Sequence, residues 1–185
     1  VWKLAARELG EETGVWATAA MLLFPGSIFL TAVYTESLFL LLSVTAIDAA
    51  RRRAFGLAGV AAALATLTRP NGLLLGLPLA IEWLTALRRR ERVGWTWPLI
   101  GLPLLALGLH SALLYQVYGD PLYFQSIQRD WGRRFSMPWN ALLEFRYDPD
   151  YYAATLAALA AIYYAWRYRF ALSLQAHAAT SLLLP

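Results

Sequence analysis

The chain has 185 residues, of which 59% are hydrophobic and 15% are charged, which leaves too little polar surface for a water-soluble domain. Its 16 Lys and Arg residues lie in short clusters at the ends of apolar runs, and this excludes the continuous basic patch of a nucleic-acid-binding protein. Because there is no cysteine and there are two isolated histidines, we expect no disulfide, no metal site on protein ligands and no cofactor.

The chain divides into seven apolar runs. Residues 1–14 precede them with an amphipathic pattern typical of a helix at the membrane surface. Pro25 and Gly26 interrupt the first run, because proline removes a backbone hydrogen bond and clashes with the preceding turn. The runs cover residues 15–33, 37–50, 54–68, 73–87, 93–118, 151–166 and 170–185. We therefore predict an all-α integral membrane protein, with one transmembrane helical domain over residues 1–185 and about seven membrane segments in a polytopic bundle.

Gly72 and Gly76 open the fourth run at a spacing that favours close approach of two helix backbones. The run ends at Arg88, and we expect Glu82, which lies near that basic cluster, to pair within the bundle. Asp48 is expected to pair with Arg51 or Arg52, about one turn further along.

Residues 119–150 form an extended polar region that is rich in aromatic residues. Four apolar residues within it recur at helical spacing, namely Phe124, Ile127, Trp131 and Phe135. Part of the region is therefore predicted to be an amphipathic helix lying in the membrane interface, on the non-cytoplasmic side. Gln125 and Gln128 lie three residues apart along one edge of this helix. They either reach sugar hydroxyls or are simply solvated.

The positions of Lys and Arg predict the orientation in the membrane. If the amino-terminal segment and the three Arg clusters are cytoplasmic, that side holds eleven of the 16 basic residues. Glu36, the turn at Arg69 and the 119–150 loop then fall on the non-cytoplasmic face. The second and third runs are shorter than a hydrocarbon core of about 30 Å. We therefore expect Glu36 and Arg69 to lie close together on the floor of a recess.

Glu36 is a carboxylate between two apolar runs, where a charge is costly unless it meets water or a partner. Arg69 offers a two-pronged donor that matches phosphate oxygens. Either Arg69 binds a phosphate, with Glu36 positioning it or holding hydroxyl groups, or the two side chains merely tie two helices together. Tyr34 is either a substrate contact or an interface aromatic, and Asn71 is either a substrate contact or a cap of the turn before Gly72.

Five segments in a fixed order also carry a family resemblance. They are Phe24-Pro25, Ser27-Ile28-Phe29-Leu30, Tyr34-Thr35-Glu36-Ser37-Leu38-Phe39, Thr66-Leu67-Thr68-Arg69-Pro70-Asn71-Gly72, and Phe124-Gln125 followed by Gln128 and Trp131-Gly132-Arg133. Together they resemble the PIG-V-type mannosyltransferases, the family of the second GPI mannosyltransferase and its bacterial relatives.

The resemblance implies a multi-pass glycosyltransferase of the GT-C fold. Such an enzyme transfers a sugar from a polyprenyl (dolichol-type) phosphate donor to a lipid-linked or glycan acceptor on the non-cytoplasmic face. The membrane would be the bacterial cytoplasmic membrane or the endoplasmic reticulum. The implied substrate-binding residues are Tyr34, Glu36, Arg69, Asn71, Gln125, Gln128, Trp131 and Arg133.

In that family the acid thought to act as general base lies in the first non-cytoplasmic loop. This chain starts at Val1 without a Met and ends in the middle of an apolar run, as a piece of a longer polytopic protein would. We therefore expect the base upstream of Val1, and no catalytic residue is assigned within the 185.

Two other classes fit broken helices and buried charges. A transporter or channel segment usually contains an internal repeat, but neither the Tyr-Thr-Glu-Ser element nor the Arg-Pro-Asn-Gly element occurs twice. A non-catalytic membrane scaffold would leave the convergence of Glu36, Arg69 and the aromatic loop on one face without a purpose. The glycosyltransferase interpretation explains that convergence.

Overall fold

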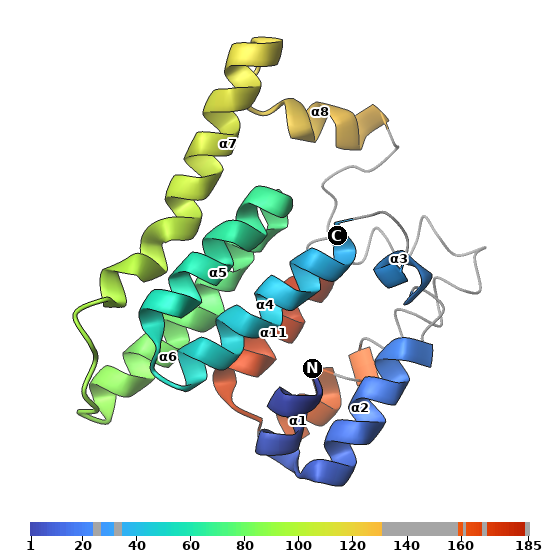
Figure 1. The fold of residues 1–185 in the computed structure, drawn as a ribbon, viewed down its shortest axis with the longest axis vertical. Helices are drawn as coiled ribbons and strands as arrows, with labels where there is room; N and C mark the ends of the chain where they lie inside the picture. The colour runs from blue at the N-terminus through green and yellow to red at the C-terminus, as the bar shows by residue number, and fades with distance from the viewer. Residues whose placement is uncertain (24–26, 32–34, 131–158, 161, 168–169, 184–185) are drawn as a thin grey trace. The chain divides into compact units, whose positions relative to one another are not determined.

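The computed structural model describes residues 1–185 except 24–26, 32–34, 131–158, 161, 168–169 and 184–185, and each regular element within the described part is helical (Figure 1). The elements are α1 (Trp2–Leu9), α2 (Glu11–Leu23), α3 (Ile28–Thr31), α4 (Glu36–Arg51), α5 (Phe55–Thr68), the 3₁₀ helix η2 (Pro70–Leu75), α6 (Gly76–Arg88), the 3₁₀ helix η3 (Trp97–Gly101), α7 (Leu102–Tyr118), α8 (Tyr123–Asp130) and α11 (Leu172–Leu183). They belong to two units, Val1–Leu107 and Gly108–Pro185. The predicted all-α class is confirmed.

Two continuous helical stretches are long and apolar enough to cross a membrane. One joins η2 to α6 over Pro70–Arg88, and the other joins η3 to α7 over Trp97–Tyr118. Their mean hydropathies are 1.2 and 1.6. The count of about seven membrane segments stays a prediction.

In the first unit, α5 packs against α4, α6 and η3 (Figure 1). Its buried face consists mainly of small residues, which allow neighbouring backbones to come close. The buried residues of α5 are Phe55, Ala58, Gly59, Ala61, Ala62, Ala65 and Thr66. At Gly59 a β-carbon would lie only 2.0 Å from the backbone oxygen of Leu99, so η3 can reach α5 only because this residue has no side chain.

Where the structure describes them, the helix bounds follow the apolar runs, and the main differences lie in the amino-terminal segment, the first run and the fifth run. The predicted amino-terminal surface helix over residues 1–14 is wrong in extent, because α1 ends at Leu9, Gly10 has a φ of 95°, and α2 begins at Glu11. The first apolar run is divided, since α2 ends at Leu23 and the next described helix begins at Ile28. The fifth run becomes helical at Trp97 rather than at Val93, with Pro98 in the first turn, where proline is favoured.

α4 and α5 have 16 and 14 residues. At 1.5 Å per residue they are about 24 and 21 Å long, less than the roughly 30 Å of a hydrocarbon core. This agrees with the lengths predicted from the sequence. α4 begins at Glu36, and α5 ends at Thr68, directly before Arg69. The two charged residues expected to pair therefore lie at the start of one helix and at the end of the other.

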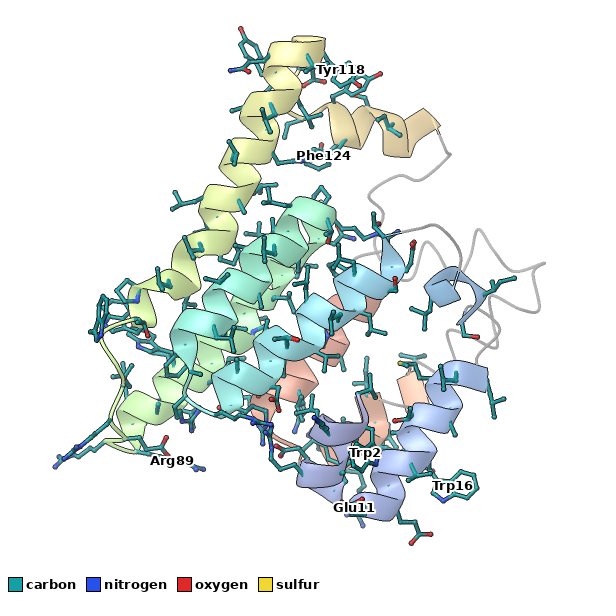
Figure 2. All side chains as sticks on the ribbon, viewed as in Figure 1. Trp2, Glu11, Trp16, Arg89, Tyr118 and Phe124 are labelled. Carbon is teal, nitrogen blue, oxygen red and sulfur yellow. The ribbon has the colours of Figure 1, made fainter. Side chains whose placement is uncertain are left out.

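In the second unit, α8 begins beside the end of α7 and extends away from it at a steep angle, as Figure 2 shows near the labelled Tyr118 and Phe124. Gly119, with a φ of 73°, allows the change of direction, because left-handed backbone is unstrained in glycine. Tyr118 stacks on Tyr123 with ring centroids 4.1 Å apart, and Phe124 lies 6.0 Å from the ring of His110. α8 is the beginning of the predicted interfacial helix. The remainder, from Trp131 on, lies outside the described residues.

Candidate functional site

The Thr-Arg-Pro-Asn-Gly element forms a tight turn between α5 and η2. Pro70 disfavours helical backbone in the residue before it, and Arg69 is accordingly extended, with φ −151° and ψ 129°. The Arg69 amide still donates to the Ala65 carbonyl at 3.0 Å, and the Arg69 carbonyl accepts from the Gly72 amide at 2.8 Å. A β-carbon on Gly72 would lie 2.4 Å from the Thr66 nitrogen, so only glycine closes the turn this tightly. The backbone of Arg69 is thereby fixed at the end of α5.

Glu36 is the first residue of α4, where a carboxylate is favoured by the partial positive charge of a helix amino terminus. Its Oε1 accepts a hydrogen bond from Nη2 of Arg69 and forms an ion pair with it. The pair joins residues 33 positions apart and connects the start of α4 to the end of α5. The predicted proximity of Glu36 and Arg69 is confirmed. Whether they lie in a recess stays a prediction.

The pair leaves hydrogen-bonding groups for a ligand. The Arg69 side chain is 45% exposed and that of Glu36 is 23% exposed. Nε and Nη1 of Arg69 make no hydrogen bond within the described part of the chain, and Glu36 Oε2 is buried without a partner there. A half-exposed guanidinium with unused N–H donors can bind an anion, while its carboxylate partner holds it in place.

The other predicted site residues are less well determined. Asn71 is exposed, and its side chain makes no hydrogen bond to any described residue, so the predicted turn cap is not found. Gln125 is exposed on α8 in the second unit, and Gln128 belongs to the same helix. Tyr34, Trp131 and Arg133 lie outside the described residues. The structure thus brings together Glu36 and Arg69, and the roles of the other six residues stay predictions.

A second group of charges lies at the carboxyl-terminal end of α4, far from Glu36, and involves α6. Glu82 is buried and is shared by two arginines, Arg51 Nη1 at 3.0 Å and Arg53 Nη1 at 2.6 Å. Nε of Arg51 also binds Glu8 Oε1 at 2.8 Å, and Nε of Arg53 binds Glu91 Oε2 at 2.5 Å. Burial opposes the charge of Arg53, but its hydrogen bonds to Glu91 and Glu82 outweigh burial and raise its pKa.

Sequence reasoning finds the local part of this group only. The predicted pairing of Asp48 with an arginine in the next turn is confirmed by Arg52, whose Nε lies 2.8 Å from Oδ2. The expectation that Glu82 pairs within the bundle is also confirmed. Its partners Arg51 and Arg53 were not predicted. The sequence signal for such a pairing is Glu82 itself, because an isolated carboxylate in an apolar run is costly unless a cation lies beside it.

No cluster of three or more His, Asp or Glu residues that could hold a metal ion occurs among the residues with a described placement. The site chemistry rests on the guanidinium of Arg69 and the carboxylate of Glu36.

Comparison of the sequence with known proteins identifies the family of this chain. Residues 1–144 match the Alg9-like mannosyltransferase family, and this span contains all the predicted site residues. A 75-residue part of the chain, 40% of its length, is 43% identical to "GPI mannosyltransferase 2" of Yarrowia lipolytica (strain CLIB 122 / E 150). The matched part spans 21% of that relative's length. No solved structure matches the chain.

Proposed function

Because the chain belongs to the Alg9-like mannosyltransferase family, we propose that it forms part of a membrane glycosyltransferase that uses mannose carried on a polyprenyl (dolichol-type) phosphate. The proposed acceptor is a lipid-linked sugar or a glycan. The likeness of part of the chain to a GPI mannosyltransferase supports a glycolipid acceptor of this general kind.

The observation that carries the proposal is the half-exposed guanidinium of Arg69, oriented by Glu36. Transfer forms a bond between the acceptor oxygen and the anomeric carbon and breaks the bond between that carbon and a phosphate oxygen, so the polyprenyl phosphate that leaves gains negative charge. Nη2 of Arg69 carries two N–H groups, so one can remain on Glu36 while the other, together with Nε or Nη1, would form a fork that donates to the phosphate oxygens. Arginine suits this role better than lysine, because its planar fork fixes two donors at once.

We assign to Glu36 a positioning role. The acceptor hydroxyl must lose its proton to a base within hydrogen-bond reach. Oε1 of Glu36 is engaged by Arg69 and Oε2 is buried, so this carboxylate is proposed to hold the guanidinium in place rather than to act as the base. The general base is proposed to come from a residue that precedes Val1. Tyr34, Asn71, Gln125, Gln128, Trp131 and Arg133 complete the proposed substrate contacts.

The proposed reaction takes place on the non-cytoplasmic face of a multi-pass protein. Support comes from the two helical stretches able to cross a membrane and from the gathering of basic residues at one end of α4 and α6. Glu36 and Arg69 lie at the opposite ends of α4 and α5 from that basic group.

The orientation predicts a labelling pattern, which the absence of native cysteine makes simple to read. Single cysteines are introduced into the intact protein in its membrane, and an impermeant thiol reagent is applied from the non-cytoplasmic side. The positions expected to be shielded are Arg52, Arg89 and Arg167. The positions expected to react are Gly119, Asn140 and Asp148. Reversal of the two groups would remove both the orientation and the proposed face of reaction.

The donor class is tested with the intact protein and two radiolabelled donors, mannosyl-phosphoryl-polyprenol and a nucleotide diphosphate mannose. Label should pass to a glycolipid acceptor from the lipid donor and not from the nucleotide donor. Membranes that lack the protein serve as the control. Transfer from the nucleotide donor alone would contradict the proposed function.

A further inference from the structure

An apolar groove runs between α6 and the start of the second candidate membrane span, within the first unit. Its volume is about 630 Å³, within the roughly 300–1,000 Å³ typical of ligand sites. Its walls include Leu73, Leu77, Ala80, Trp83, Pro98 and Leu104. Gly76 and Gly101 also line it, and a β-carbon at either residue would meet no other atom within 4 Å. The groove is therefore open where these two glycines lie.

One wall of the groove contains a polar group without a partner. Trp83 stacks on Trp97 with ring centroids 5.0 Å apart and an interplanar angle of 19°. The indole Nε1 of Trp83 is buried and has no acceptor within the described part of the chain. The groove therefore meets the aromatic surface of this tryptophan pair.

The face of α6 that lines the groove leads to a turn rich in arginine. Leu84 and Leu87 follow Ala80 at the spacing of one helix face, and both are more than 40% exposed. The helix then ends at Arg88 and enters the turn where Figure 2 shows the labelled Arg89. Apolar surface and positive charge are thus continuous along this side of α6.

The arginines of this turn differ from those of α4. Arg51, Arg52 and Arg53 each bind at least one carboxylate. The four arginines of the α6 turn are exposed and form no ion pair with any described residue, and they are Arg88, Arg89, Arg90 and Arg92. Their charge is uncompensated by the protein in the part of the chain that the structure describes.

Arg90 also has a backbone conformation that normally belongs to glycine. Its φ is 55°, and it closes α6 with hydrogen bonds from its own amide to Leu87 and from Glu91 to Ala86. Arg53 has the same conformation at the end of α4, where its side chain binds Glu82 and Glu91. Arg90 has the same backbone conformation but no ion-pair partner among the described residues.

We propose that the groove and this turn together bind one anionic phospholipid. One acyl chain lies in the groove, and the phosphate lies against the arginines at the end of α6 and in the turn that follows it. Charge complementarity selects an anionic over a zwitterionic headgroup, because the headgroup of the latter brings its own cation to four arginines. The proposal rests on the membrane placement given above and is independent of sugar transfer.

Two variants of the intact protein separate the two parts of this site, and each has a matched control. Gly76→Leu fills the groove, and Gly108→Leu makes the same change at a glycine of α7 that also has open space around it and does not line the groove. Arg89→Gln with Arg90→Gln removes two charges from the turn. Arg52→Gln with Arg167→Gln removes two exposed charges elsewhere.

The measurement is native mass spectrometry of the detergent-solubilised protein mixed with phosphatidylglycerol or phosphatidylcholine of the same acyl composition. The unaltered protein should retain phosphatidylglycerol about tenfold better than phosphatidylcholine. The Arg89/Arg90 variant should lose this preference, Gly76→Leu should lose retention of both lipids, and both controls should behave as the unaltered protein. Size-exclusion chromatography confirms that each variant is folded.

Three results would overturn the proposal. The first is equal retention of the two lipids by the unaltered protein. The second is full retention by Gly76→Leu. The third is displacement of phosphatidylglycerol by polyprenyl phosphate together with a raised donor KM in Gly76→Leu, which would assign the groove to the donor's lipid tail. The first two results would leave the evidence for or against mannose transfer unchanged, whereas the third would support a lipid-linked donor.

Discussion

Replacing Arg69 with lysine in the intact protein should lower the rate of mannose transfer by about 100-fold, the loss typical of removing one positioned donor from a developing negative charge. Lysine keeps the positive charge and still allows an ion pair with Glu36. It cannot hold Glu36 with one N–H group while a planar fork of two further N–H groups faces a phosphate. The measurement is kcat/KM for a radiolabelled mannosyl-phosphoryl-polyprenol.

The matched control for this change is Arg52→Lys, because Arg52 is an exposed arginine that also binds one carboxylate, that of Asp48. It should transfer mannose at the rate of the unaltered protein. Both variants should be recovered in normal amounts, since the Arg69 side chain is 45% exposed. A fully active Arg69→Lys variant would show that this side chain does not bind the phosphate, and the ion pair would then only tie α4 to α5.

Replacing Glu82 with glutamine should destabilise the fold by about 3–5 kcal/mol, the usual effect of removing one partner from a buried charge cluster. Glu82 is 7% exposed and neutralises both Arg51 and Arg53. The amide keeps the shape of the side chain but leaves two partly buried guanidinium groups without their shared carboxylate. For a chain of this size the midpoint of thermal unfolding should fall by about 10 °C.

The control for Glu82 is Glu11→Gln, which removes the same charge from an exposed residue with no ion pair among the described residues. Its midpoint should differ from that of the unaltered protein by less than about 2 °C. Intrinsic tryptophan fluorescence during heating in detergent gives both values. Equal midpoints for the two variants would mean that the α4–α6 ion pairs contribute little to stability, despite their short distances.

The sequence predicts the helices well because charged residues and prolines mark where they end. Arg51 to Arg53 and Pro70 mark where α4 and α5 end, and apolar residues fill the lengths between such signals. The Glu36–Arg69 pair is also predictable. α4 and α5 are both short, so the start of α4 and the end of α5 are expected at the same depth in the membrane. The family resemblance came from motifs within the same region, and the match over residues 1–144 confirms it.

What the sequence does not predict depends on helix rotation and on backbone strain. The relative rotation of α4 and α6 decides which arginines pair with Glu82, and the sequence of either segment alone does not contain that information. The interpretation of Gly76 as a close-packing residue is wrong: Gly72 contacts α5 tightly, but Gly76 opens onto the groove. The left-handed backbone of Arg53 and Arg90 is also not predictable, because glycine is the residue that usually signals this conformation at the end of a helix.

The central claim is that Arg69 recognises the phosphate of a lipid-linked sugar. The most direct measurement compares two ligands of the intact protein, mannosyl-phosphoryl-polyprenol and a mannosyl-polyprenol that lacks the phosphate. Arg69→Lys should weaken binding of the first about tenfold, as expected for loss of one charge-assisted hydrogen bond, and should leave binding of the second unchanged. An equal loss for both ligands, or no loss for either, would contradict the claim.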